Sequence, residues 1–252
     1  MTSSSGLLFW DRHRSTLAAA AAASRSRYAW SAYQGAVCPE PHGAAERAFL
    51  AHLGGAFDLG QPGRLLPRED EVSPYTGQPL RVRYPVAEVE ELTVAATVAW
   101  PRWRLADPRQ RLGVCLEIAD RLFRRNGELG LAAMHTTGQS AAMSRSGSGT
   151  NALDRGLEAL VKVHELTERI PTTGIWSRHF GRSTVTLEKR YRTVPVGLST
   201  VVACASFPAW NVYPALLANL ASGNPVIVKP HPTSVLQMAL AVSVCREVLR
   251  EA

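Results

Sequence analysis

The C-terminal part of the chain, residues 194–250, has the pattern that most constrains the fold. Residues 198–204 (LSTVVAC) are typical of a buried strand, and a loop and an apolar segment with helical spacing follow them. A second strand is predicted at 225–228 and a second helix at 235–249. Strand, helix, strand, helix is the repeating unit of a parallel α/β sheet. Because such a sheet needs further strands and cover on both faces, we predict an α/β fold with an incomplete doubly wound sheet.

Composition favours a globular protein and excludes few functions. The 252 residues are 46% hydrophobic and 19% charged, which is ordinary for a soluble domain. The net charge of +7 comes mostly from scattered arginines, so nucleic-acid binding is the least favoured function. The four cysteines (Cys38, Cys115, Cys204 and Cys245) lack CxxC spacing and lie mostly in apolar runs, which indicates reduced thiols buried in the core. The N-terminus resembles a transit peptide in composition, but its alanine run favours a helix, and we expect a cytoplasmic protein.

Several helices are predicted before the sheet. An apolar stripe runs through residues 88–103, and Asp107 followed by Pro108 indicates the start of another helix. We expect further helices at 128–136 and after Thr150, which would cap the last of them. A turn at 73–79 precedes a short strand predicted at 80–84.

Residues 185–194 (VTLEKRYRTV) partly alternate between apolar and polar side chains. This pattern predicts an exposed antiparallel hairpin or edge strand. Such an edge often pairs with another subunit, and the alternative is a capped edge in a monomer.

A glycine motif at 147–152 (GSGTNA) matches the dinucleotide-binding pattern G-x-G-x-x-G/A. That pattern binds a pyrophosphate only where a strand leads into the turn and a helix follows. Residues 141–146 are not strand-like. We therefore interpret the stretch as a flexible linker.

Polar side chains at the ends of the two predicted strands are the candidate site. In parallel α/β sheets, ligands bind beyond the carboxyl ends of the strands. Asn211 lies there, just before a helix, where its amide could stabilise a developing oxyanion or merely cap the helix. Lys229 ends the second strand and would face a nucleotide ribose or phosphate, or only solvent. His231 could contact the same ligand, or only water.

These motifs, taken in order, resemble the N-terminal half of an aldehyde dehydrogenase from about residue 71 to 252. The extension from Phe9-Trp10 to about Pro67, the loop FPAWNVYP and the KPHP sequence further resemble PaaN-type phenylacetic acid degradation proteins. The matching segments are Ser73-Pro74-Tyr75-Thr76-Gly77, Trp103, Arg111, Thr137-Gly138-Gln139, Pro195-Val196-Gly197, Trp210-Asn211 and 223–230.

The resemblance implies NAD- or NADP-dependent oxidation of an aldehyde through a thiohemiacetal on a cysteine. It assigns oxyanion stabilisation to Asn211 and cofactor contacts to Trp210, Lys229 and His231, with no metal. The implied organisation is an N-terminal extension (1–70), a helical part of the cofactor domain (71–182), an oligomerisation strand or hairpin (183–196), and the first half of the cofactor-binding sheet (197–252). The implied partners are an aldehyde, in phenylacetate or aromatic-acid catabolism, and further copies of the chain, without nucleic acid or membrane.

Three departures from the family's pattern qualify this function. Pro232 replaces the glutamate of the common K-P-S-E sequence, which leaves room for the 2′-phosphate of NADP. The stretch from Asn211 to Lys229 is shorter than usual by about one and a half helical turns. The family's nucleophilic cysteine and general base are missing, so we expect no dehydrogenase activity from these residues alone. The alternative is a non-catalytic half-domain that acts through protein–protein association.

Overall fold

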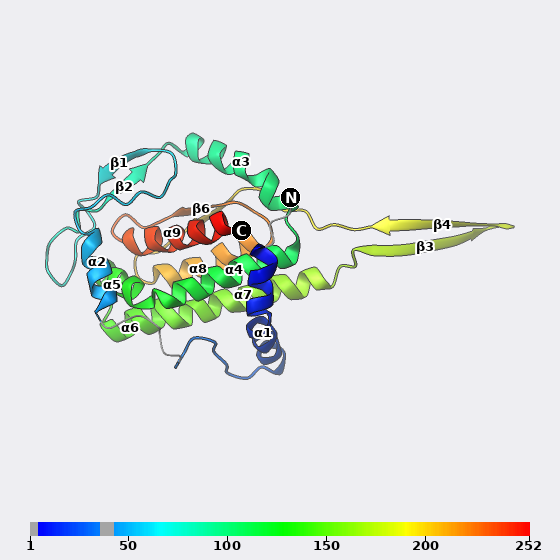
Figure 1. Ribbon diagram of the computed structural model, residues 1–252, viewed down its shortest axis with the longest axis horizontal. Helices are drawn as coiled ribbons and strands as arrows, with labels where there is room; N and C mark the ends of the chain where they lie inside the picture. Colours follow the sequence, from blue (N-terminus) through cyan, green and yellow to red (C-terminus); the bar gives the residue numbers. More distant parts are fainter. Residues whose placement is uncertain (1–4, 36–42) are drawn as a thin grey trace.

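The computed structural model describes residues 5–35 and 43–252, and Cys38 lies outside them. A layer of helices packs beside a short parallel sheet, an arching helix lies over that sheet, and a hairpin projects far from the body (Figure 1). The N-terminal elements are α1 (Ser5–Ser26), α2 (Ala44–His52), β1 (Arg64–Pro67), β2 (Arg83–Val86) and α3 (Val89–Leu105). The helices that follow are α4 (Pro108–Arg124), α5 (Asn126–Thr137), α6 (Ala141–Arg145) and α7 (Asn151–Glu168). The remaining elements are β3 (Thr173–Phe180), β4 (Ser183–Arg190), β5 (Ser199–Val202), α8 (Pro208–Ala221), β6 (Val226–Lys229) and α9 (Leu236–Glu251).

Helix α4 begins where the sequence predicts. The Asp107 carboxylate accepts the Arg109 N–H at 2.8 Å, and the Gln110 side chain accepts the Asp107 N–H at 3.0 Å. This reciprocal cap satisfies two backbone donors that the first helical turn leaves without partners. The apolar face of α4 then packs against α1, α7, α8 and α9, so it lies at the centre of the core.

Strands β5 and β6 pair in parallel, with Val202 opposite Lys229. Helix α8 connects them and packs against both. An apolar cleft of about 760 Å³ lies beside β6, between α3 and α9. These features confirm the predicted α/β class and the incomplete parallel sheet. Val202, the last residue of β5, remains 58% exposed.

The projecting hairpin consists of β3 and β4, which pair antiparallel along their full length (Figure 1). The prediction at 185–194 covered only the second strand and ran past its end at Arg190. Every residue of β4 is exposed, and Ile175 on β3 is 81% exposed. The first strand escaped prediction because little of it is buried, so its sequence lacks a clear apolar face.

The short strand predicted at 80–84 lies three residues further along, in β2, and includes Pro85. The apolar alternation was real, because Leu80, Val82 and Tyr84 are all buried. Proline is tolerated in β2 because, among the described strands, β2 pairs with β1 alone, apart from a single bridge between Ala56 and Arg83.

The Gly/Ser-rich stretch is not a flexible linker, which corrects that prediction. Residues 146–150 form a kink between α6 and α7, where Gly149 has non-helical backbone angles, and Gly147, Ser148 and Gly149 are buried. Thr150 has helical backbone angles and makes no side-chain cap. The chain leading into this turn is helical, so the context of a dinucleotide-binding glycine motif is missing, as the sequence predicted.

Over the described ranges, the helices are too short or too polar to cross a membrane.

Candidate functional site

The carboxyl ends of β5 and β6 are joined by backbone hydrogen bonds. Ala203 N–H donates to the Lys229 carbonyl at 2.9 Å, one residue beyond the Val202–Lys229 pair. The two loops that leave the sheet therefore start side by side. This is the edge where open parallel sheets bind ligands.

Asn211 lies within the first turn of α8, which corrects the prediction that it precedes the helix. It does not cap that helix, because its Oδ1 accepts the backbone N–H of Cys204 at 3.0 Å. Asn211 is exposed. Its oxygen holds the loop, and its Nδ2 makes no hydrogen bond to a described residue.

Lys229 is exposed at the end of β6 and forms no ion pair with a described residue. His231 is half-buried, with its Nδ1 2.9 Å from Thr233 Oγ1. Trp210, next to Asn211 on α8, is 44% exposed. The backbone thus brings Lys229 and Asn211 to one edge of the sheet, and Trp210 and His231 flank them in sequence.

Gln139 connects this edge to the helical layer. Its Nε2 donates to the Ser206 carbonyl, and its Oε1 accepts from Ser148 Oγ at 2.9 Å. The sequence marked Gln139 only as part of a family motif. Its structural role is to join the loop before α8 to the kink between α6 and α7.

Glu71 is a residue that sequence reasoning missed. It is fully buried, and its carboxylate accepts hydrogen bonds from Tyr84 and from two backbone amides of the α9 start. Burial raises the pKa of Glu71 above its ordinary value, although these hydrogen bonds oppose the rise. No local signal predicts this contact, because its partners on α9 lie more than a hundred residues away along the chain.

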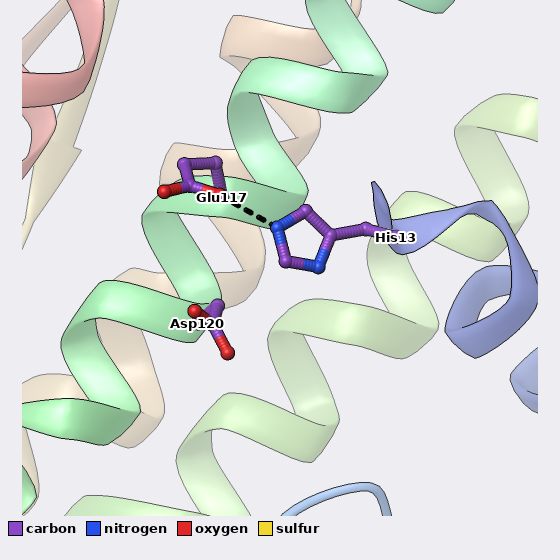
Figure 2. A group of neighbouring side chains, drawn as sticks. All are labelled: His13, Glu117 and Asp120. Atoms are coloured by element: carbon purple, nitrogen blue, oxygen red, sulfur yellow. Dashed lines mark hydrogen bonds and ion pairs between the residues drawn. The ribbon is translucent and has the colours of Figure 1, made fainter. Parts of the chain in front are cut away.

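His13, Glu117 and Asp120 form a second polar cluster, between α1 and α4 (Figure 2). His13 Nε2 lies 2.7 Å from Glu117 Oε2, which also accepts from Arg12 at 2.9 Å. Arg121 occupies the other carboxylate oxygen at 2.9 Å. Burial alone would raise the pKa of Glu117, but the hydrogen bonds from His13 and Arg121 and the charge of Arg12 lower it. With both oxygens already bonded to cationic groups, the cluster joins two helices as an ion-pair junction.

The described cysteines lack the surroundings of an activated nucleophile. Cys115 and Cys245 are buried free thiols, as predicted, and burial raises the pKa of Cys245 to about 12. Burial raises the pKa of Cys115 as well. Cys204 is half-buried, which corrects the prediction of a core residue, and its Sγ accepts the Phe207 N–H at 3.4 Å. A thiol with a raised pKa holds little of the thiolate that attacks a carbonyl.

Comparisons with known proteins agree with this geometry. The family model described as "Aldehyde dehydrogenase family" matches residues 67–250. An NAD-dependent aldehyde dehydrogenase from Burkholderia multivorans is 41% identical, with a TM-score of 0.91 over 96% of this chain and 44% of that one. This chain therefore spans less than half the length of that relative. No curated protein matches.

More distant structures share the fold. Proline utilization A from Bdellovibrio bacteriovorus is 19% identical, with a TM-score of 0.62 over 81% of this chain and 21% of that one. PnpE, solved in complex with nicotinamide adenine dinucleotide, is 22% identical, with a TM-score of 0.54 over 73% of this chain and 36% of that one. The family match covers most of the chain, and the Burkholderia multivorans enzyme aligns with nearly all of it. The chain belongs to the aldehyde dehydrogenase family.

Proposed function

We propose that this chain is the cofactor-binding portion of an NAD(P)-dependent aldehyde dehydrogenase. The observation that carries the proposal is the placement of Asn211 and Lys229 at the joined carboxyl ends of β5 and β6. It is supported by the 41% identity to an NAD-dependent aldehyde dehydrogenase. The substrate we propose is an aldehyde of phenylacetate or aromatic-acid catabolism. This choice rests on the resemblance of the N-terminal extension and the KPHP sequence to PaaN-type proteins.

The residues present suit a nicotinamide dinucleotide. Lys229 supplies an exposed cation without an ion-pair partner among the described residues, where the ribose of the adenosine would lie. Pro232 places no carboxylate there, so a 2′-phosphate would meet no like charge. When bound, the cofactor accepts a hydride. Asn211 would use its Nδ2 donors to stabilise an oxyanion, while its Oδ1 remains bonded to Cys204.

The same proposal holds that these residues do not oxidise an aldehyde alone. Cys115 and Cys245 are inaccessible, and burial raises the pKa of each thiol. Cys204 has no hydrogen bond to a carboxylate or imidazole base among the described residues; its Sγ accepts from Ser206 Oγ and the Phe207 N–H. The nucleophile would have to come from the portion of the family fold that this chain does not span.

We also propose association of copies through the β3–β4 hairpin, in the cytoplasm. The hairpin exposes apolar side chains far from the core, including Ile175 at 81% and Phe180 at 51%. Exposed strands with unpaired backbone groups favour pairing with another chain. Ile175→Lys would introduce a charge into that contact, and sedimentation should show a smaller particle if the hairpin holds the copies together. An unchanged particle would contradict this part of the proposal.

The functional test is an assay for NADH or NADPH production from phenylacetaldehyde. The purified chain should give none alone, and activity should appear when it is co-expressed with the remaining portion of the Burkholderia multivorans enzyme. Asn211→Ala in the same pair should lower kcat, because the oxyanion donor is lost, by a factor of about 100 or more. Turnover by the chain alone, or an unaffected kcat in the variant, would contradict the assignment.

A further inference from the structure

Helix α9 begins without a cap from its own sequence. Its N-terminal flanking residue, Val235, has no side-chain oxygen to accept the free amides of the first turn. The hydroxyl of the nearby Thr233 instead lies 2.9 Å from His231 Nδ1. The helix start is also buried, since Ser234, Leu236 and Gln237 are fully inaccessible. A buried helix end without partners for its amides would be costly, so the cap must come from elsewhere.

Glu71 supplies that cap from the other end of the fold. Its Oε1 accepts the N–H groups of Val235 at 2.6 Å and Leu236 at 2.7 Å. Its Oε2 accepts the hydroxyl of Tyr84 at 2.8 Å. A carboxylate at a helix N-terminus is also favoured by the helix dipole. The residue is therefore fully bonded although it is buried.

The capped amides directly follow the turn that carries the proposed cofactor residues. Ser234 N–H donates to the His231 carbonyl at 3.0 Å, and Ser234 Oγ lies 3.0 Å from Thr136 Oγ1. Only Pro230 separates His231 from Lys229 at the end of β6. The turn is thus attached at one end to the sheet and at the other to Glu71.

We propose that Glu71 is a positioning residue for the turn at 229–234, and that it acts by capping α9 across the fold. This inference rests on the proposed function only in assigning that turn to cofactor binding. The reach of the side chain matters more than its charge, because a single oxygen, Oε1, accepts both amides. A neutral side chain of the same length therefore preserves the cap, and a shorter acid does not.

Two substitutions separate reach from charge. Glu71→Gln keeps an oxygen at the same distance, and its NH₂ group can donate to the Tyr84 hydroxyl oxygen. Glu71→Asp keeps the charge but shortens the side chain by one methylene. Both variants retain a polar side chain of similar volume, so both should fold.

The experiment measures hydrogen–deuterium exchange of the ligand-free chain and its two variants. In Glu71→Asp, peptides covering residues 230–240 should exchange about tenfold faster, whereas peptides from α4 keep the wild-type rate. Glu71→Gln should restore the 230–240 rate to within about threefold of wild type. Unchanged exchange in Glu71→Asp, faster exchange in Glu71→Gln than in Glu71→Asp, or an equal rise in α4 would overturn the inference.

A second measurement keeps the two proposals apart. Isothermal titration with NADP⁺ should show affinity weakened about fivefold in Glu71→Asp and nearly unchanged in Glu71→Gln. An equal affinity in all three proteins would overturn the positioning role. If the wild type bound neither NADP⁺ nor NAD⁺, the proposed function would fail, whereas the exchange data would still decide whether Glu71 caps the turn.

Discussion

The side-chain oxygen of Asn211 accepts the backbone N–H of Cys204 at 3.0 Å, which ties the first turn of α8 to the end of β5. One residue earlier, Ala203 N–H donates to the Lys229 carbonyl. Two hydrogen bonds therefore link the candidate oxyanion donor to the strand that ends in the candidate cofactor lysine. The geometry of the site depends on the Asn211 oxygen, and the oxyanion stabilisation that we propose for it depends on the Asn211 nitrogen.

This division of roles predicts different effects for two variants of Asn211. Asn211→Ala removes the acceptor for Cys204 and should lower the free energy of unfolding by about 1 kcal/mol. Asn211→Asp keeps the acceptor near a helix N-terminus and should unfold close to wild type. Urea denaturation of the three proteins measures the difference. Equal destabilisation by both substitutions would show that the hydrogen bond to the Cys204 N–H contributes nothing to the free energy of unfolding.

Gly223 should be far less tolerant of a side chain than Gly181. Both have positive φ, +90° and +60° respectively. A Cβ at Gly223 would lie 2.8 Å from Pro195 Cγ, whereas one at Gly181 would meet nothing within 4 Å. Gly181→Ala should therefore cost about 1 kcal/mol of backbone strain, and Gly223→Ala clearly more. Chemical denaturation of the two variants compares them, and equal losses would refute the predicted crowding.

Arg111 should resist its conservative replacement by lysine. Its Nε donates to the Ala221 carbonyl at 2.9 Å, and its NH1 to the Ala106 carbonyl at 2.5 Å, so one side chain joins the end of α8 to the α3–α4 loop. A single ammonium group cannot span both. Arg111→Lys should lower the free energy of unfolding by about 1.5 to 3 kcal/mol. The exposed Arg109→Lys is the matched control and should change it little; similar losses in both would contradict the bridging role.

The Glu117 junction should contribute to stability at neutral pH and lose that contribution in acid. Burial opposes ionisation of Glu117, but its hydrogen bonds from His13 and Arg121 lower the pKa below the ordinary value of 4.5. Between the two values the unfolded chain binds more protons, so the free energy of unfolding falls as pH drops from about 4.5 through the folded pKa.

Glu117→Gln tests this pH dependence. The stability difference from wild type should be largest above about pH 5 and should shrink in more acidic buffer. Glu158→Gln, which removes the partly exposed pair with Arg155, is the control and should show a much smaller change. A wild-type advantage that is independent of pH would contradict the ionised junction.

Local patterns predicted the elements that carry their own signals. Asp107 and Pro108 marked the start of α4, and the apolar runs at β5 and β6 predicted the parallel pair. Contacts across the chain were beyond such patterns. Gly149 lies at the kink between α6 and α7, where a Cβ would collide with Asn126 Oδ1, although its neighbours have the composition of a linker. The Glu71 cap joins residues that only the folded core brings together.

The candidate site could be predicted in its members but not in its geometry. Asn211 and Lys229 follow strand-like runs, so their position at one sheet edge could be inferred. The hydrogen bond that turns the Asn211 oxygen toward Cys204 could not, because α8 begins at Pro208, before Asn211, whereas the sequence indicates a helix that begins after it.

The most direct test of the account is calorimetric titration of the folded chain with NAD⁺ and NADP⁺, for wild type, Lys229→Ala and Lys189→Ala. Lys189 is an exposed lysine on the hairpin, away from the sheet edge, and serves as the matched control. Wild type and Lys189→Ala should bind a dinucleotide with the same affinity, and Lys229→Ala should bind it about tenfold more weakly. Failure of the folded wild type to bind either dinucleotide, or equal affinity in Lys229→Ala, would contradict the account.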